Sequence, residues 1–261
     1  MIINIRLSSF FLMLVAGVLC SGMGCIKIDA TVNFGREGNG SFRAMYGMPS
    51  YILKRVEADR QLTRSLDYAA GKPSASSQTE LDIPFLYDEV ALKSRFKGLS
   101  SDEVILEALK TREQGGWRYV DFTLKFSTLE SLFKQSFFKD FGVSFMHIDE
   151  NTCKLVVTLP PVGNTPDAMS MATPESLAKL TPFLNGFRVI TRITVPGDIR
   201  NSTSLMSDSQ RATWEWDFDK DARALERLSH DKIIIVFDAA GIKIRDFEKP
   251  AGTTVLSRKS S

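Results

Sequence analysis

Alternating apolar and polar positions along much of the chain predict β-strands with one buried face. Between residues 26 and 34 every second side chain is apolar, and the glycines at 35–40 supply the turn of a hairpin to a strand at 42–46. The segment WRYVDFTLKF, at 117–126, alternates in the same way and is expected to be a central strand. Further strands are expected at 143–148, 153–159, 187–195, 212–218 and 232–237.

Other segments carry apolar residues three and four positions apart, the spacing of a helix with one buried side. Ser100 and Glu103 form a capping-box pattern at the start of the segment 102–113, and Thr173 with Pro174 matches the start of the segment 173–185. The expected helices lie at 48–70, 87–96, 102–113, 173–185 and around Leu225 and Leu228.

One more helix is expected after Ser127, which forms a capping-box pattern with Glu130. Its aromatic residues can lie along one side, and two interpretations are open. They pack in the core beneath a sheet, or they form one wall of a cavity for an apolar ligand. The residues of this possible wall are Phe133, Phe137, Phe138 and Phe141.

Strands and helices mix without strict alternation, which favours an α+β fold built on a mainly antiparallel sheet with several helices packed on it. The length of 261 residues and the 43% of hydrophobic residues allow one sizeable core. We expect a signal peptide at 1–24, a single domain at 25–248, and a polar, loose tail at 249–261.

The amino-terminal segment has the build of an export signal. Arg6 precedes an apolar run at 10–19, which is too short for the roughly 20 residues that span a bilayer. Gly24 and Cys25 then resemble a lipobox, the site at which bacterial lipoproteins are cut and lipidated, although Gly22 stands where Leu is usual. The alternative is an ordinary cleaved signal that ends near a cysteine. With lipidation, the acyl chains, palmitate among them, hold Cys25 stably on a membrane.

Charge balance argues against nucleic acid as a partner. Lys and Arg total 33 against 31 Asp and Glu, a formal net charge of +2. Binding to phosphates along a nucleic acid requires a broad basic surface, which this composition does not indicate.

Two groups of residues suggest chemistry only weakly. His147 and Cys153 flank a predicted hairpin turn and form a conceivable nucleophile pair, but opposite strands can place them on different faces. Asp217, Asp219 and Asp221 imitate the start of a calcium loop, yet Ala222 and Leu228 stand where such a loop needs Gly and Glu. The sequence therefore predicts no catalytic residue, no metal site and no cofactor.

Three segments carry a family resemblance. They are CIKIDATVNFGREGNGSFRAMY from position 25, WRYVDFTLKFSTLESL from 117, and ITVPGDIRNSTS from 193 followed by ATWEWDF from 212. Together they resemble the LppM-like family of bacterial lipoprotein domains. The resemblance implies an envelope protein, with binding of lipid or glycolipid as a suggested role and no catalytic residues to transfer.

The expected function is therefore that of a bacterial envelope lipoprotein, held on a membrane through Cys25. Its domain is expected to bind an apolar ligand, lipid or glycolipid, or an envelope protein, without catalysis. A structural or assembly factor of the envelope is the alternative, and an enzyme is less expected.

Overall fold

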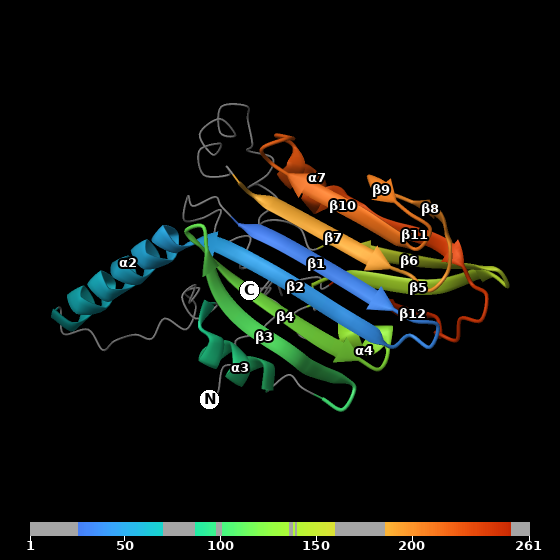
Figure 1. Ribbon diagram of the computed structural model, residues 1–261, viewed down its shortest axis with the longest axis horizontal. Helices are drawn as coiled ribbons and strands as arrows, with labels where there is room; N and C mark the ends of the chain where they lie inside the picture. Colours follow the sequence, from blue (N-terminus) through green and yellow to red (C-terminus); the bar gives the residue numbers. More distant parts are fainter. Residues whose placement is uncertain are drawn as a thin grey trace, which may run out of the picture.

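The computed structural model describes residues 26–69, 87–97, 101–135, 138, 140–159 and 186–251. Two β-sheets dominate this part of the chain (Figure 1). Cys25, Phe137 and the helix expected at 173–185 lie outside the described residues.

The larger sheet has seven strands in the order β3-β4-β2-β1-β7-β10-β9. Its neighbours are antiparallel except β1 and β7, which run parallel. In chain order the strands are β1 (Lys27–Phe34), β2 (Gly40–Pro49), β3 (Val104–Gln114), β4 (Trp117–Phe126), β7 (Arg188–Thr194), β9 (Met206–Ser207) and β10 (Arg211–Asp217).

The smaller sheet has five antiparallel strands in the order β12-β5-β6-β11-β8. It lies toward the end of the larger sheet that is opposite α2 (Figure 1). The strands are β5 (Gly142–Asp149), β6 (Thr152–Thr158), β8 (Ile199–Ser202), β11 (Lys232–Asp238) and β12 (Phe247–Lys249).

The core fills the space between the sheets because each strand turns one face inward. The Phe34 ring of β1 meets the Phe237 ring of β11 edge to face, with centroids 6.2 Å apart. One continuous cluster of buried apolar residues includes members of both sheets, among them Val120, Leu155 and Trp216. The alternation seen in the sequence therefore marks the inward face, as expected.

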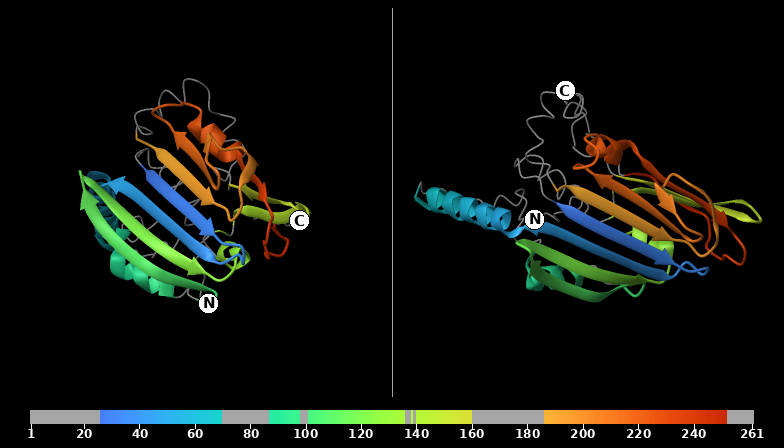
Figure 2. Two further views of the ribbon diagram at one scale, coloured as in Figure 1. Left: turned by 45° about the vertical axis from the view of Figure 1, so that its right-hand side comes forward. Right: turned by 45° about the horizontal axis from the view of Figure 1, so that its top comes forward.

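The helices are peripheral and differ in how they are held. In the described part of the chain they are α2 (Ser50–Ala69), α3 (Glu89–Lys97), α4 (Leu129–Phe133) and α7 (Ala224–His230). The α3 helix lies along β3, where the backbone amide of Thr111 donates to Oε2 of Glu89 at 3.3 Å. The α2 helix projects away from both sheets (Figures 1 and 2).

Two helix predictions are wrong. Residues 102–113 form most of β3, because this segment pairs with β4 along almost its whole length. The helix expected from Ser127 to Phe141 ends at Phe133. Its cap is Thr128, whose Oγ1 accepts from the amide of Ser131 at 3.0 Å, so Ser127 and Glu130 do not form the capping box.

The fold is therefore mainly β with some helices, and the expected α+β class matches it only in part. The antiparallel character was predicted well, whereas the short strands β8, β9 and β12 were not predicted. Lys249, the first residue of the expected loose tail, is the last residue of β12. Its Nζ donates to the carbonyl oxygens of Phe138 and Phe141, both at 2.7 Å.

Candidate functional site

A groove of about 440 Å³ opens where α2 leaves β2. We call it the α2 groove. It is bounded by the first three turns of α2, by the start of α3 and by the facing ends of β3 and β4. Its lining residues are Ser50, Leu53, Lys54, Glu57, Ala58, Gln61, Tyr87, Asp88, Glu113 and Arg118.

Close packing at the end of β2 sets the position of this groove. Gly47 lies beneath the Tyr119 ring, and a Cβ at residue 47 would stand 2.4 Å from Cδ1 of that ring. The amide of Ser50 then donates to the carbonyl oxygen of Gly116 at 2.8 Å. Gly115 and Gly116 have φ of 58° and 76°, a conformation that glycine adopts without steric cost, so the β3–β4 turn can reach the start of α2.

Two residues that line the groove, Tyr87 and Ser50, have buried hydroxyl groups that lack hydrogen-bond partners in the described part of the chain. Tyr87 is only 1% exposed, and its ring packs edge to face on Tyr46 with centroids 5.4 Å apart. Burial raises the pKa of the Tyr87 hydroxyl well above its ordinary value, so the group stays protonated. A buried polar group without a partner costs about 1–3 kcal/mol, so a ligand that supplies the missing hydrogen bonds would recover that free energy.

Charges of both signs surround the mouth of the α2 groove. Lys54 and Arg118 are basic, whereas Glu57, Asp88 and Glu113 are acidic. Arg118 and Glu113 approach each other to 3.9 Å, and Oδ1 of Asp88 accepts from the amide of Ala91 at 2.8 Å. The lining groups are therefore slightly acidic in sum, which disfavours a strongly anionic ligand and suits a neutral polyhydroxyl group.

The described phenylalanines of the predicted ligand wall lie in the core. Phe133, Phe138 and Phe141 are buried, and Phe138 packs on both of the others with centroids 5.1 and 5.3 Å apart. Phe138 also meets the Phe42 ring of β2 at 5.1 Å. None of these three side chains lines the α2 groove. Their role in a ligand cavity stays a prediction.

His147 and Cys153 are brought together as register partners on β5 and β6. Nδ1 of His147 lies 2.7 Å from Oδ1 of Asp246, so an imidazole, a carboxylate and a thiol share this end of the sheet. Burial, with smaller contributions from the charges of Asp246 and Asp149, raises the pKa of the Cys153 thiol to about 11. The thiol is therefore protonated at neutral pH and is a poor nucleophile.

The three aspartates that imitate a calcium loop have protein partners. Oδ1 of Asp217 accepts from the amide of Asp219, that of Asp219 from the amide of Gly186, and that of Asp221 from the amide of Arg223. Within the described residues, His, Cys, Asp and Glu side chains form no group able to hold a metal ion. These aspartates shape the turn between β10 and α7.

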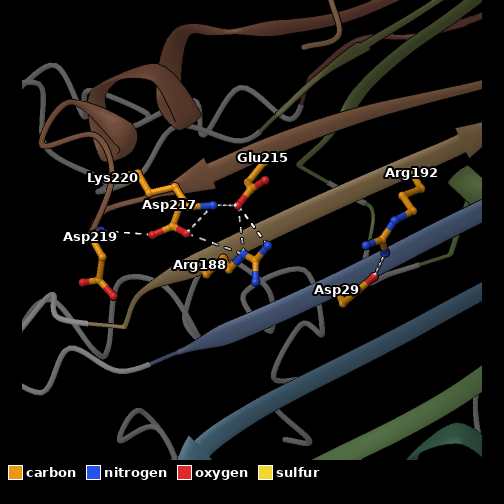
Figure 3. Close-up of polar contacts among 7 residues, drawn as sticks. All are labelled: Asp29, Arg188, Arg192, Glu215, Asp217, Asp219 and Lys220. Carbon is orange, nitrogen blue, oxygen red and sulfur yellow. Dashed lines mark hydrogen bonds and ion pairs between the residues drawn. The ribbon is translucent and has the colours of Figure 1, made fainter. Parts of the chain in front are cut away.

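Charged side chains on the outer face of the large sheet are paired with one another (Figure 3). Nε of Arg188 donates to Glu215 at 3.0 Å, and Nζ of Lys220 reaches the same carboxylate at 2.9 Å. Asp29 and Arg192 form a second pair on the neighbouring strands β1 and β7. Because each of these charges already has a partner, this surface is better explained as cross-strand stabilisation than as a binding site.

No helix in the described part of the chain is long and apolar enough to cross a bilayer.

The sequence did not indicate Ser50 or Tyr87 as candidate site residues. The sequence holds no signal for either, since an unpartnered hydroxyl depends on which groups the fold brings around it.

Comparisons with known proteins add little to this geometry. No model of a known protein family matches the chain, and no curated protein matches it. Among solved structures, the folded domain of LppM from Mycobacterium tuberculosis, determined by NMR, is similar to this chain. The two share 12% sequence identity at a TM-score of 0.37, over 83% of this chain and 91% of that domain. The family resemblance in the sequence thus has only a weak structural counterpart.

Proposed function

We propose that this protein is a lipid-anchored binding protein of the bacterial envelope, which takes the neutral, hydroxyl-rich head of a glycolipid into the α2 groove. The observation that carries the proposal is made at Tyr87: the residue lines the groove, and its hydroxyl is buried and has no partner among the described residues. Ser50 Oγ supplies a second such group. Each hydroxyl can both donate and accept, as a sugar hydroxyl can.

The acidic groups at the mouth support a neutral head over a phosphate. Glu57, Asp88 and Glu113 outnumber Lys54 and Arg118. A phosphate would be repelled by more carboxylates than it could pair with cations, whereas sugar hydroxyls donate readily to carboxylates.

The membrane location rests on the lipobox-like Cys25, which directly precedes the first described residue, Ile26. Lys27 pairs with Gly47, three residues before α2 begins. An anchor on Cys25 would therefore hold the α2 end of the domain, and with it the groove, close to the lipid surface.

Binding is tested with the lipidated protein in phosphatidylcholine nanodiscs, titrated with a glucosyl-diacylglycerol whose short acyl chains keep it soluble. Tyr87→Phe removes one hydroxyl and is expected to weaken binding about three- to tenfold, the effect of one neutral hydrogen bond. Tyr68→Phe removes an exposed hydroxyl near the far end of α2, outside the groove, and should leave the affinity unchanged.

A phosphatidylglycerol with the same chains serves as the anionic comparison and should bind more weakly. The proposal fails if the glycolipid does not bind, or if Tyr87→Phe binds it as tightly as the native protein. The anchor is tested separately, by incorporation of a tagged palmitate analogue that should disappear in Cys25→Ala.

A further inference from the structure

The α2 helix has an exposed apolar stripe, made of Tyr51, Leu62 and Leu66, which no described part of the fold covers. These side chains are 66%, 60% and 61% exposed. At 100° per residue they fall within about 60° of the helix circumference, roughly opposite Leu53, which is buried at the base of the helix. The stripe is therefore a separate surface from the one that attaches α2 to the domain.

The described residues give α2 little packing beyond its first turn. Among the described side chains of α2, only Ile52 and Leu53 in its first turn are buried, and the rest of the helix extends away from both sheets (Figures 1 and 2). Most helical stability in proteins comes from packing of an apolar side, and isolated helices in water are marginal. The exposure of Leu62 and Leu66 is best explained by a surface that covers them when the protein is in its cellular location.

The place where the chain enters the fold indicates that surface. Ile26 is buried, and its carbonyl oxygen accepts from the amide of Arg188 at 2.9 Å, so the preceding chain leaves from this end of the sheet. Lys27 pairs with Gly47, which places the start of α2 beside that point. A lipid on Cys25 would therefore lie at the same end of the molecule as the base of α2.

Side chains at the same end suit a lipid interface. Nζ of Lys27 lies 4.2 Å from the centre of the Trp117 ring, and Trp117 pairs with Pro49, the residue before α2. Tryptophan and lysine are frequent at the boundary between lipid and water. The α2 sequence carries four basic and three acidic residues. Exposed Arg55 falls within the arc of the stripe, where its long apolar stem would let the guanidinium reach the headgroups, as in helices that lie on membrane surfaces.

We propose that α2 lies on the bilayer, with Tyr51, Leu62 and Leu66 inserted at the boundary between headgroups and acyl chains. A second copy of the chain is a poorer occupant, because three side chains bury far less than the roughly 800 Å² per partner of a stable interface. A membrane already held by the anchor needs only weak additional contact, because tethering raises the effective concentration. The inference rests on the proposed membrane location but not on glycolipid binding. If α2 lies on the bilayer in this way, the orientation of the α2 groove relative to the lipid surface is determined.

The experiment measures the depth of α2 in vesicles whose phospholipids are brominated on their acyl chains. An environment-sensitive fluorophore is attached to Leu62→Cys in the full-length lipidated protein, with Cys153→Ala to leave a single reactive thiol. The same label on Glu150→Cys, in the β5–β6 turn at the other end of the molecule, is the matched control. The label at residue 62 should emit at shorter wavelength and be quenched severalfold more strongly than the label at residue 150. Adding Leu66→Glu should remove most of that difference.

Two outcomes would overturn the proposal. One is equal quenching at residues 62 and 150 while the protein stays in the membrane fraction. The other is a blue-shifted label at residue 62 without quenching, which would indicate a protein partner instead of lipid. Loss of the protein from the membrane fraction would count against the anchor at Cys25. In that case brominated vesicles are added to the released protein, and the same comparison of quenching decides whether α2 binds them.

Discussion

The Tyr87 ring meets the Tyr46 ring edge to face, with centroids 5.4 Å apart and planes inclined by 71°. This contact joins a residue just before α3 to β2, and Tyr87 also lines the α2 groove. The Tyr87 hydroxyl is buried and has no partner in the described part of the chain. Tyr87 therefore combines a ring that packs on Tyr46 with a hydroxyl that has unused hydrogen-bonding capacity.

Tyr87→Phe is expected to stabilise the unliganded protein. The substitution keeps the ring against Tyr46 and removes an unsatisfied buried hydroxyl, which should raise the free energy of unfolding by about 1 kcal/mol. Urea unfolding in the absence of lipid measures the change. Tyr51→Phe, on an exposed ring, should leave the midpoint unmoved. A loss of stability in Tyr87→Phe would mean that the hydroxyl has a partner in solution, which would contradict its proposed role in ligand binding.

Gly47→Ala is expected to destabilise the end of β2 that supports the groove. The new Cβ would lie 2.4 Å from the Tyr119 ring, so the ring or the strand must move, at a cost of about 1–3 kcal/mol. Denaturant unfolding of Gly47→Ala, Tyr119→Ala and the double variant forms a thermodynamic cycle. The added cost of Gly47→Ala should largely vanish when Tyr119 is already Ala. Equal costs in both backgrounds would refute the steric explanation.

The strands that the sequence predicted well are those whose own pattern determines them. The hairpin of β1 and β2 combines strict alternation with turn glycines, and both features act locally. The segment of β3 failed because only Val104 and Leu109 are buried in it, so its side chains show little alternation. Pairing with β4, a contact between separate segments, decides its conformation. The α2 groove was beyond prediction for a related reason: Ser50 and Tyr87 lie 37 positions apart and line one groove only in the folded chain.

Cys153 is expected to resist thiol reagents while the protein is folded. Burial raises the pKa of its thiol to about 11 from an ordinary value of 9.0, so little thiolate forms at pH 8. A raised folded-state pKa contributes stability that is fully present below pH 9 and is lost as the pH rises toward 11. In a chain carrying Cys20→Ser and Cys25→Ser, labelling at pH 8 should be slow in buffer and fast in urea. Fast labelling in buffer would show that the thiol is reactive in the folded protein, which would favour a nucleophile pair of Cys153 and His147.

Glu215 gives a pH dependence of the opposite sense. Its hydrogen bond from Lys220, followed by the charges of Arg188 and Lys220, lowers the pKa of this carboxyl below its ordinary value. A lowered folded-state pKa contributes stability that is present above about pH 4.5 and disappears as the pH falls through the lowered value. Glu215→Gln should therefore cost up to about 1 kcal/mol at pH 7, the scale of a partly exposed ion pair, and almost nothing at pH 2.

Urea unfolding at both pH values measures this difference, and Glu150→Gln, on the exposed β5–β6 turn, is the control that should show no cost at either pH.

The network in Figure 3 explains why the effect is confined to Glu215 and its neighbours: Arg188 and Lys220 contact both Glu215 and Asp217. After Glu215→Gln the two cations can still pair with Asp217, which limits the loss. Removing both carboxylates should therefore cost more than the sum of the single substitutions, because Arg188 and Lys220 would then face each other unpaired. A strictly additive result would show that the four charges act independently.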